Sequence, residues 1–201
     1  MQSHFDYLTA LLIGGGVLLA LAFTYATGQK SAGDATRFAA ARSSLTAIVD
    51  VFGQDLSNVG AGVTTGHRLD VPVGTAPTTQ FEFSGTVGPT ETAVVERVRY
   101  QTVRRGTVAV VVAGARQTVP AYEVQRLILN PATGLYSPSG ASVPTVTEFS
   151  VSLRDAAGAT VTDAALARQV AVRIAIASPL GQGAGPSVVR WQRAFQITPA
   201  P

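Results

Sequence analysis

Hydrophobic residues crowd the start of the chain before a more regular pattern sets in. The run from Leu8 to Ala26, LTALLIGGGVLLALAFTYA, contains no charged residue. As a helix it would rise about 28 Å, which matches a bilayer core of about 30 Å. Tyr7 and Tyr25 stand at its two ends, where aromatic residues favour the membrane–water interface. The run therefore predicts a membrane-spanning helix.

A cleaved signal peptide is the main alternative for this segment. Signal peptides have a basic first region, an apolar core of about 7–15 residues and a small-residue cleavage site. The residues before Leu8, MQSHFDY, contain no Lys or Arg, and the apolar run is longer than such a core. Ala20-Leu21-Ala22 fits the cleavage pattern but lies inside the run. We therefore expect a retained anchor.

A second helical pattern follows over residues 34–60. Hydrophobic residues recur there at spacings of three and four, so they share one face of a helix. The stripe consists of Phe38, Ala41, Leu45, Ile48, Phe52, Leu56 and Val59. We expect this stripe to pack on a sheet, chiefly through Phe38, Leu45, Ile48, Phe52 and Leu56. Asp50 and Asp55 are interpreted as solvated charges on other faces.

Glycines occur within, between and after the two helical stretches. Gly28 and Gly33 interrupt the connection, Asp34 has the character of an N-cap, and Gly60 that of a C-terminal stop. The prediction is one long helix, with a break at the glycines left open. Gly14-Gly15-Gly16 stands in the middle of the apolar run. It indicates either close helix packing or local flexibility, although glycine is also common in membrane helices generally.

The pattern changes to short β-type runs after Gly62. Phe149, Val151 and Leu153 alternate with polar residues, which is the period of a half-buried strand. The predicted strands are 79–84, 94–103, 107–113, 122–130, 145–153, 169–177 and 188–197. Without a further long helix, they should form a mostly antiparallel sheet with the amphipathic helix on one face, an α+β fold. Residues 1–33 would form the transmembrane or filament-core helix, 34–62 its amphipathic continuation and 63–201 the head.

Composition and charge narrow the functional classes. Charged residues make up 13% of the chain, against about 25% in typical soluble domains. The net charge of +3 rests mostly on scattered arginines. The densest cluster is Arg97, Arg99, Arg104 and Arg105, and we interpret it as a strand surface rather than a nucleic-acid site. The absence of cysteine excludes disulfides, thiolate metal sites and a cysteine nucleophile.

No motif for catalysis is evident. The two histidines, His4 and His67, stand at the predicted membrane edge and in a predicted loop. The chain has no G-x-S-x-G context for a nucleophile and no phosphate-binding loop. We therefore expect no enzyme activity, no cofactor and no metal site.

Three stretches of the sequence form a recognisable combination. The first is 44–50 followed by Asp55-Leu56-Ser57-Asn58-Val59-Gly60, similar to a "D-L-x-N-A-G" helix ending. The second is Val98-Arg99-Tyr100 followed by 122–126, similar to a "V-x-Y…L-x-R" strand pair. The third is the late hairpin formed by 146–153, 155–158 and 170–177. Together with the N-terminal helix, they resemble a type IV pilin-like protein, and more narrowly the larger minor pilins and pseudopilins of the W-type and J-type classes.

The resemblance implies a structural subunit of a type IV pilus-like or type II secretion-like filament. Its partners would be other pilin-like subunits, envelope assembly machinery and membrane lipid. The chain would cross the inner membrane once, with its head outside the cytoplasm. Lys30, Arg37 and Arg42 follow the apolar run and none precedes it, so the positive-inside rule alone favours the opposite orientation.

The N-terminus departs from the family pattern. A pilin leader ends in glycine, and glutamate is the fifth mature residue; here Phe5 follows His4, and Thr9 stands at the glutamate position. Either the chain is an uncleaved member or the natural chain starts earlier. Asp6 is the nearest acid, so we expect Asp6 and Gly14 to Gly16 to mediate filament-core packing. The alternatives are a membrane-anchored extracytoplasmic binding or accessory module that does not polymerise, and a tethered enzyme.

Overall fold

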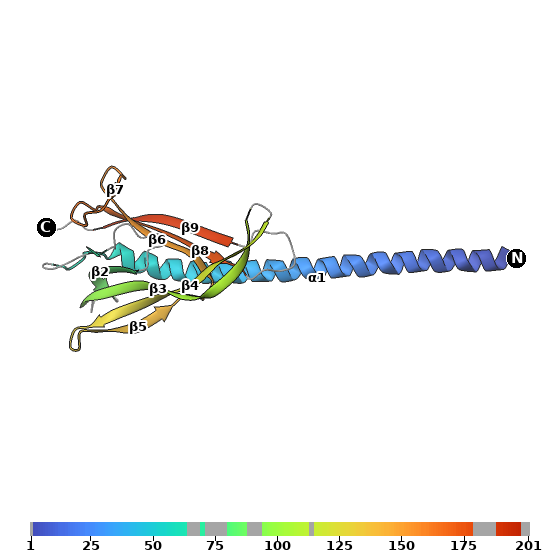
Figure 1. Cartoon of the computed structure of the whole chain (residues 1–201), viewed down its shortest axis with the longest axis horizontal. Helices are drawn as coiled ribbons and strands as arrows, with labels where there is room; N and C mark the ends of the chain where they lie inside the picture. Colours follow the sequence, from blue (N-terminus) through green and yellow to red (C-terminus); the bar gives the residue numbers. More distant parts are fainter. Residues whose placement is uncertain are drawn as a thin grey trace.

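One helix, α1, carries the first part of the chain from Gln2 to Ser57 without interruption (Figure 1). The computed structural model describes residues 2–63, 69–70, 80–87, 94–112, 115–178 and 188–197, with side chains from Tyr7 onward in α1. Gly28 and Gly33 do not break the helix, because a glycine costs only about 1 kcal/mol relative to alanine in a helix extended on both sides. Asp34 is correspondingly not an N-cap. It lies mid-helix, 3.6 Å from Nη1 of Arg37.

The helix ends against the sheet. Gly60, the predicted stop, has φ of 78°, in the left-handed region that favours glycine. Its amide donates a hydrogen bond of 2.9 Å to the Ser84 carbonyl, and Val59 forms a bridge to Gly85. A Cβ on Gly85 would overlap the Asn58 carbonyl oxygen, so the strand approaches the chain closely there.

The described strands form one sheet in which every pairing is antiparallel. They are β1 (Leu69–Asp70), β2 (Gln80–Val87), β3 (Val94–Val112), β4 (Ala115–Asn130), β5 (Leu135–Ala141), β6 (Val146–Arg154), β7 (Thr160–Val161), β8 (Gln169–Ala177) and β9 (Val188–Gln196). The order is β1-β2-β3-β4-β6-β8-β9, with β5 paired to β4 and β7 to β6. The predicted α+β class and antiparallel sheet are confirmed.

The strand boundaries differ from the prediction in two informative places. The predicted strands 94–103 and 107–113 are one strand, β3, whose pairing shifts register between Arg104 and Gly106. Strand β5 was not predicted, because its sequence LYSPSGA contains Pro138 and has little hydrophobic alternation. Pairing with β4 makes it a strand despite that composition.

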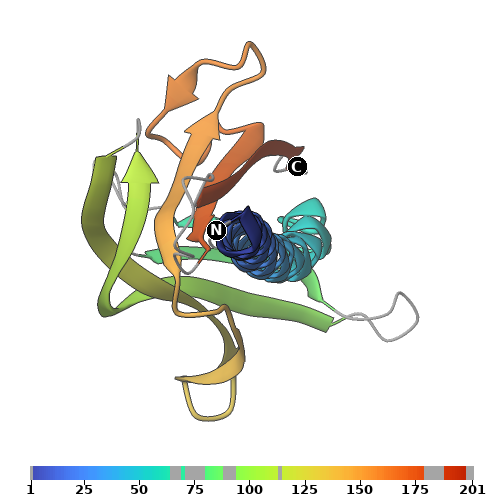
Figure 2. The ribbon, with the colours of Figure 1, turned by 90° about the vertical axis from the view of Figure 1, so that its right-hand side faces the viewer.

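The sheet curves around the C-terminal half of α1 (Figure 2) and buries most of the predicted stripe. Phe52 and Leu56 are fully buried against side chains from both halves of the sheet. The Phe52 ring lies 4.4 Å from the Tyr100 ring and 5.7 Å from the Phe149 ring, measured between centroids. The core therefore lies between α1 and the concave face of the sheet.

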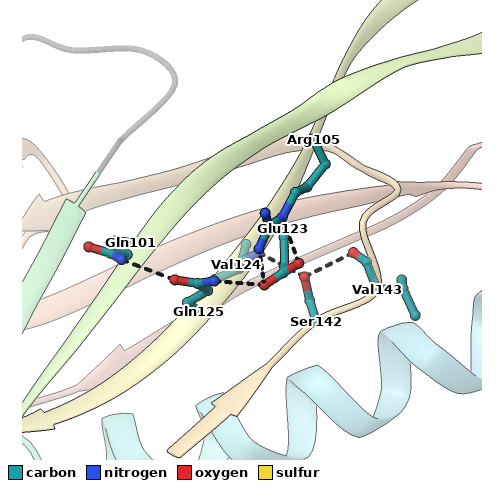
Figure 3. Close-up of polar contacts among 7 residues, drawn as sticks. All are labelled: Gln101, Arg105, Glu123, Val124, Gln125, Ser142 and Val143. Atoms are coloured by element: carbon teal, nitrogen blue, oxygen red, sulfur yellow. Dashed lines mark hydrogen bonds and ion pairs between the residues drawn. The ribbon is translucent and has the colours of Figure 1, made fainter. Parts of the chain in front are cut away.

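The sheet forks along one edge of β4. This edge pairs with β5 from Gln125 onward and with β6 at Tyr122. Between these pairings, Ser142 satisfies both backbone groups of Val124: its Oγ accepts from the Val124 amide at 2.8 Å, and its amide donates to the Val124 carbonyl at 2.8 Å. Figure 3 shows this contact beside the polar contacts among Gln101, Gln125, Glu123 and Arg105. Val124 therefore needs no backbone hydrogen-bond partner from β5 or β6 at the fork.

Candidate functional site

The N-terminal half of α1 presents bare hydrophobic surface on all sides. Its large side chains are between 54% exposed at Val17 and 77% exposed at Leu12. They are Tyr7, Leu8, Leu11, Leu12, Ile13, Val17, Leu18, Leu19, Leu21, Phe23 and Tyr25. A helix that is apolar all round belongs in a protein core or a membrane. Helix α1 is long and apolar enough to cross a membrane.

Gly14, Gly15 and Gly16 lie within this bare segment. A Cβ at any of them would meet no atom within 4 Å. Each glycine costs about 1 kcal/mol relative to alanine in an exposed helix, and nothing within the described chain benefits from its small size. Because successive helix residues are about 100° apart, the three glycines leave bare backbone over more than half of the helix circumference, and we call this stretch the glycine notch. Asp6 lies in the same helix, but its side chain is outside the described residues, as is the whole of His67.

The C-terminal half of α1 is the part attached to the head. Leu45, Phe52 and Leu56 are buried, Ile48 is half-buried against the core, and Phe38 is only partly covered. Phe38 is less covered because it precedes Ala41, the first buried residue along the described part of α1, and so stands at the edge of the segment that the sheet covers. The five predicted residues thus range from fully packed to peripheral.

Asp55 corrects the sequence interpretation. It was expected to be a solvated charge, but it is only 4% exposed and faces the sheet. Arg126 donates two hydrogen bonds to it, from Nε to Oδ2 at 2.7 Å and from Nη2 to Oδ1 at 3.1 Å. The Tyr100 hydroxyl donates a third, to Oδ2. A buried carboxylate persists because these donors compensate for lost hydration.

The electrostatics of this cluster keep the Tyr100 hydroxyl protonated and the Arg126 guanidinium charged. Burial and the adjacent Asp55 carboxylate raise the pKa of Tyr100 well above its ordinary value of 10, so the phenol remains a donor. Burial alone would lower the pKa of Arg126, but the Asp55 carboxylate outweighs that effect and leaves the pKa raised. Arg126 also donates from Nη1 to Ser139 Oγ at 2.5 Å. The cluster is a neutral, internally satisfied lock between α1, β3 and β4.

The three members of this lock come from the first two stretches that carry the pilin-like resemblance. Asp55 opens the helix-ending stretch, Tyr100 closes the first strand motif and Arg126 closes the second. Tyr100 and Arg126 are direct cross-strand partners. Sequence reasoning missed the contact because 45 residues separate Asp55 from Tyr100 and 71 separate it from Arg126. The available signal was an acid placed three residues after Phe52, beside the hydrophobic stripe.

A second buried acid, Glu82, fixes β2 to β3 and β5. It is 3% exposed, and Arg99 donates from Nε to its Oε2 at 2.8 Å. Arg97 forms an ion pair with its other oxygen, Oε1. Tyr136 also lies close to Glu82, and hydrogen bonding from its hydroxyl helps to lower the pKa of the Glu82 carboxyl. The Arg99 guanidinium lies 3.7 Å from the Tyr136 ring centroid, a cation–π contact. Arg97 and Arg99 are therefore structural partners of an acid, as well as strand-surface arginines.

A groove of about 480 Å³ runs beside the Asp55 cluster, between α1 and the segment 139–142. Its α1 wall includes Ala47, Ile48 and Val51, and its charged groups, Asp55 and Arg126, already satisfy each other. Within the described residues, no group of three or more His, Cys, Asp or Glu side chains could hold a metal ion.

A scan against protein-family models and searches of curated proteins and of solved structures found no significant match to this chain. Three features remain to indicate a function: the exposed half of α1, the buried attachment of its other half, and the motif resemblance.

Proposed function

We propose that this chain is a structural subunit, a minor pilin or pseudopilin, of a type IV pilus-like or type II secretion-like filament. It assembles through the exposed N-terminal half of α1. Its partners are other pilin-like subunits and the envelope machinery that assembles them. Before assembly, the same segment crosses the inner membrane and the head lies outside the cytoplasm.

The observation that carries this proposal is the continuity of α1 from bare segment to buried segment. The helix has no break between Tyr7 and Ser57, and the Asp55–Arg126 pair locks its far end to the sheet. The head therefore has a fixed orientation relative to the apolar helix. An ordered polymer requires such a fixed orientation in every copy, whereas a simple tether works equally well through a flexible linker.

The glycine notch supports the same conclusion. Small residues let helix backbones approach closely, and packing is what drives helix association in lipid. Three consecutive glycines, at which an added Cβ would meet nothing in the described part of the chain, are a cost that a partner helix would offset. Asp6 would then pair with a neighbouring amine or stay protonated, because an unpaired carboxylate in a dry environment is expensive.

The alternative is a membrane-anchored extracytoplasmic binding or accessory module that does not polymerise. Thr9 favours it, because an uncharged residue stands where the resembling family has its assembly glutamate. Density-gradient sedimentation of mildly solubilised envelopes separates the two proposals. A filament subunit should sediment with high-molecular-weight polymer, and an accessory module should remain in light fractions.

Orientation is tested separately, by adding protease to intact spheroplasts. With the head outside the cytoplasm, protease removes it and leaves a protected N-terminal fragment. Protection of the head until the membrane is lysed would reverse the orientation, in line with the basic residues that follow the apolar run. A cytoplasmic marker protein, which should stay intact throughout, serves as the control.

A further inference from the structure

Six exposed basic residues lie on the two elements that reach the end of the head from which the N-terminal half of α1 projects. Three lie on α1, namely Lys30, Arg37 and Arg42, and three lie on the β3–β4 hairpin, namely Arg104, Arg105 and Arg116. We call these six residues the basic end.

The sheet topology places the hairpin at this end. Strand β3 starts opposite Val87 of β2, two residues beyond Gly85, and Gly85 bridges Val59 just past the end of α1. From there β3 runs to Val112 and β4 returns from Ala115. The β3–β4 hairpin therefore extends toward the opposite end of the head, where α1 emerges (Figure 1), and Figure 2 shows it to one side of the helix.

Most of this charge is uncompensated. Arg37 lies near Asp34, and Arg105 pairs with Glu123 through Nε at 2.9 Å from Oε2. In the part of the chain that the structure describes, no ion pair joins Lys30, Arg42, Arg104 or Arg116 to an acid. Such a surface favours an anionic partner.

We propose that the basic end binds the anionic phospholipid headgroups of the membrane that α1 enters. This inference rests on the membrane-spanning part of the proposed function. The apolar run ends at Ala26, so Lys30 lies about 6 Å and Arg37 about 16 Å further along the helix axis. The headgroup layer extends about 5–8 Å beyond the hydrocarbon, and charges act over a further Debye length of about 8 Å. Long basic side chains on α1 therefore reach this zone.

The hairpin reaches the surface when the helix tilts toward its side. Membrane helices tilt by about 20° on average, and the rigid α1 carries the head with it. Arg104 and Arg116 would then define which side of the head approaches the lipid. A lipid surface fits better than a nucleic acid, because the apolar helix itself delivers this end to a bilayer.

The test measures how closely the hairpin approaches the headgroups. The chain contains no cysteine, so Thr118→Cys, at an exposed position on β4, provides a single site for a donor fluorophore. The full chain is placed in nanodiscs carrying a headgroup acceptor dye, made of phosphatidylcholine alone or with phosphatidylglycerol. We expect greater energy transfer with phosphatidylglycerol, falling as salt is raised. Each basic residue near an anionic surface contributes about fivefold, so Arg104→Gln with Arg116→Gln should weaken close approach by up to roughly 30-fold.

The matched control removes the same charge elsewhere. Arg168→Gln with Arg193→Gln lies outside the basic end and should leave the lipid dependence intact. Equal transfer in both lipids, or an equal loss in this control, would overturn the inference while leaving the membrane span standing. A chain that does not stay with the nanodiscs would overturn both. In a competition arm, short DNA is added at a concentration too low to screen charge. If it abolishes the lipid-dependent energy transfer, nucleic acid is the preferred partner instead.

Discussion

Arg126 and Asp55 form a two-pronged ion pair that fastens α1 to the sheet, with Asp55 buried and Arg126 partly buried. The two hydrogen bonds measure 2.7 Å and 3.1 Å, and the Tyr100 hydroxyl binds the same carboxylate. Asp55→Ala leaves the partly buried Arg126 charge without its carboxylate partner, which should lower the free energy of unfolding by up to about 3 kcal/mol, the lower end of the range for a fully buried pair. Chemical unfolding of the full chain in detergent measures this loss. Asp50→Ala, at an exposed position on the same helix, should change stability by less than about 0.5 kcal/mol.

A double variant separates pairing from packing at this site. Asp55→Ala combined with Arg126→Met removes both charges and should be less destabilising than Asp55→Ala alone, because no charge is left unpaired. Additive losses in the double variant would mean that the two residues act independently.

Phe52 tests the helix-on-sheet core. Its ring is fully buried between Tyr100 and Phe149, so Phe52→Ala should cost about 3–5 kcal/mol through lost burial and a residual cavity. Arg42→Ala, on an exposed face of the same helix, is the control and should be nearly silent. A loss below about 1 kcal/mol for Phe52→Ala would contradict the packing described here.

Gly85 tests the close approach of β2 to the end of α1. Gly85→Ala would place a methyl group on the Asn58 backbone, so the strand and the helix end must separate, at a cost of about 1–3 kcal/mol or more. Hydrogen exchange should then rise at the Gly60 amide, which donates to Ser84. Gly140→Ala is the matched control, because its Cβ would meet only the Arg126 Cβ at an ordinary 3.9 Å.

Because of Glu82, we expect the folded protein to lose stability in acid. Burial alone would raise its pKa, but hydrogen bonds from Tyr136 and Arg99 and the charges of Arg97 and Arg99 leave the pKa below its ordinary value of 4.5. A carboxyl with a lowered folded-state pKa stabilises the fold above its unfolded pKa, and the contribution disappears as pH falls through the folded value. Unfolding measured from neutral pH to about pH 3 should show this decline.

The variant Glu82→Gln isolates that effect. It should be less stable than the parent at neutral pH and should lose less stability on acidification, so the two curves converge below pH 4.5. Glu123→Gln is the comparison, because the pKa of Glu123 is also lowered, chiefly by Arg105, in a more exposed pair that contributes little. Parallel curves for Glu82→Gln and the parent would contradict the assignment.

Local patterns predicted much of this fold and less of the polar interior. The stripe through Leu45, Phe52 and Leu56 and the alternation in β8 depend on helix and strand periodicity, which a single sequence displays. Strand β5 depends on its neighbour β4, so Pro138 and the small residues around it obscured it. The Asp55 and Glu82 clusters join residues far apart in sequence, and only the tertiary fold brings their partners together.

Assembly through the N-terminal half of α1 is the central claim, and the glycine notch provides its most direct test. Replacing Gly14, Gly15 and Gly16 with Leu raises hydrophobicity, so membrane insertion should be unchanged, whereas bulky side chains should block close helix packing. Asp6→Ala should impair assembly more mildly. The measurement is the fraction of chain that sediments as high-molecular-weight polymer from envelopes in which carbonate extraction shows equal insertion. We expect a marked loss of polymer for the triple variant; polymer at the parent level in both variants would show that the helix is only a tether.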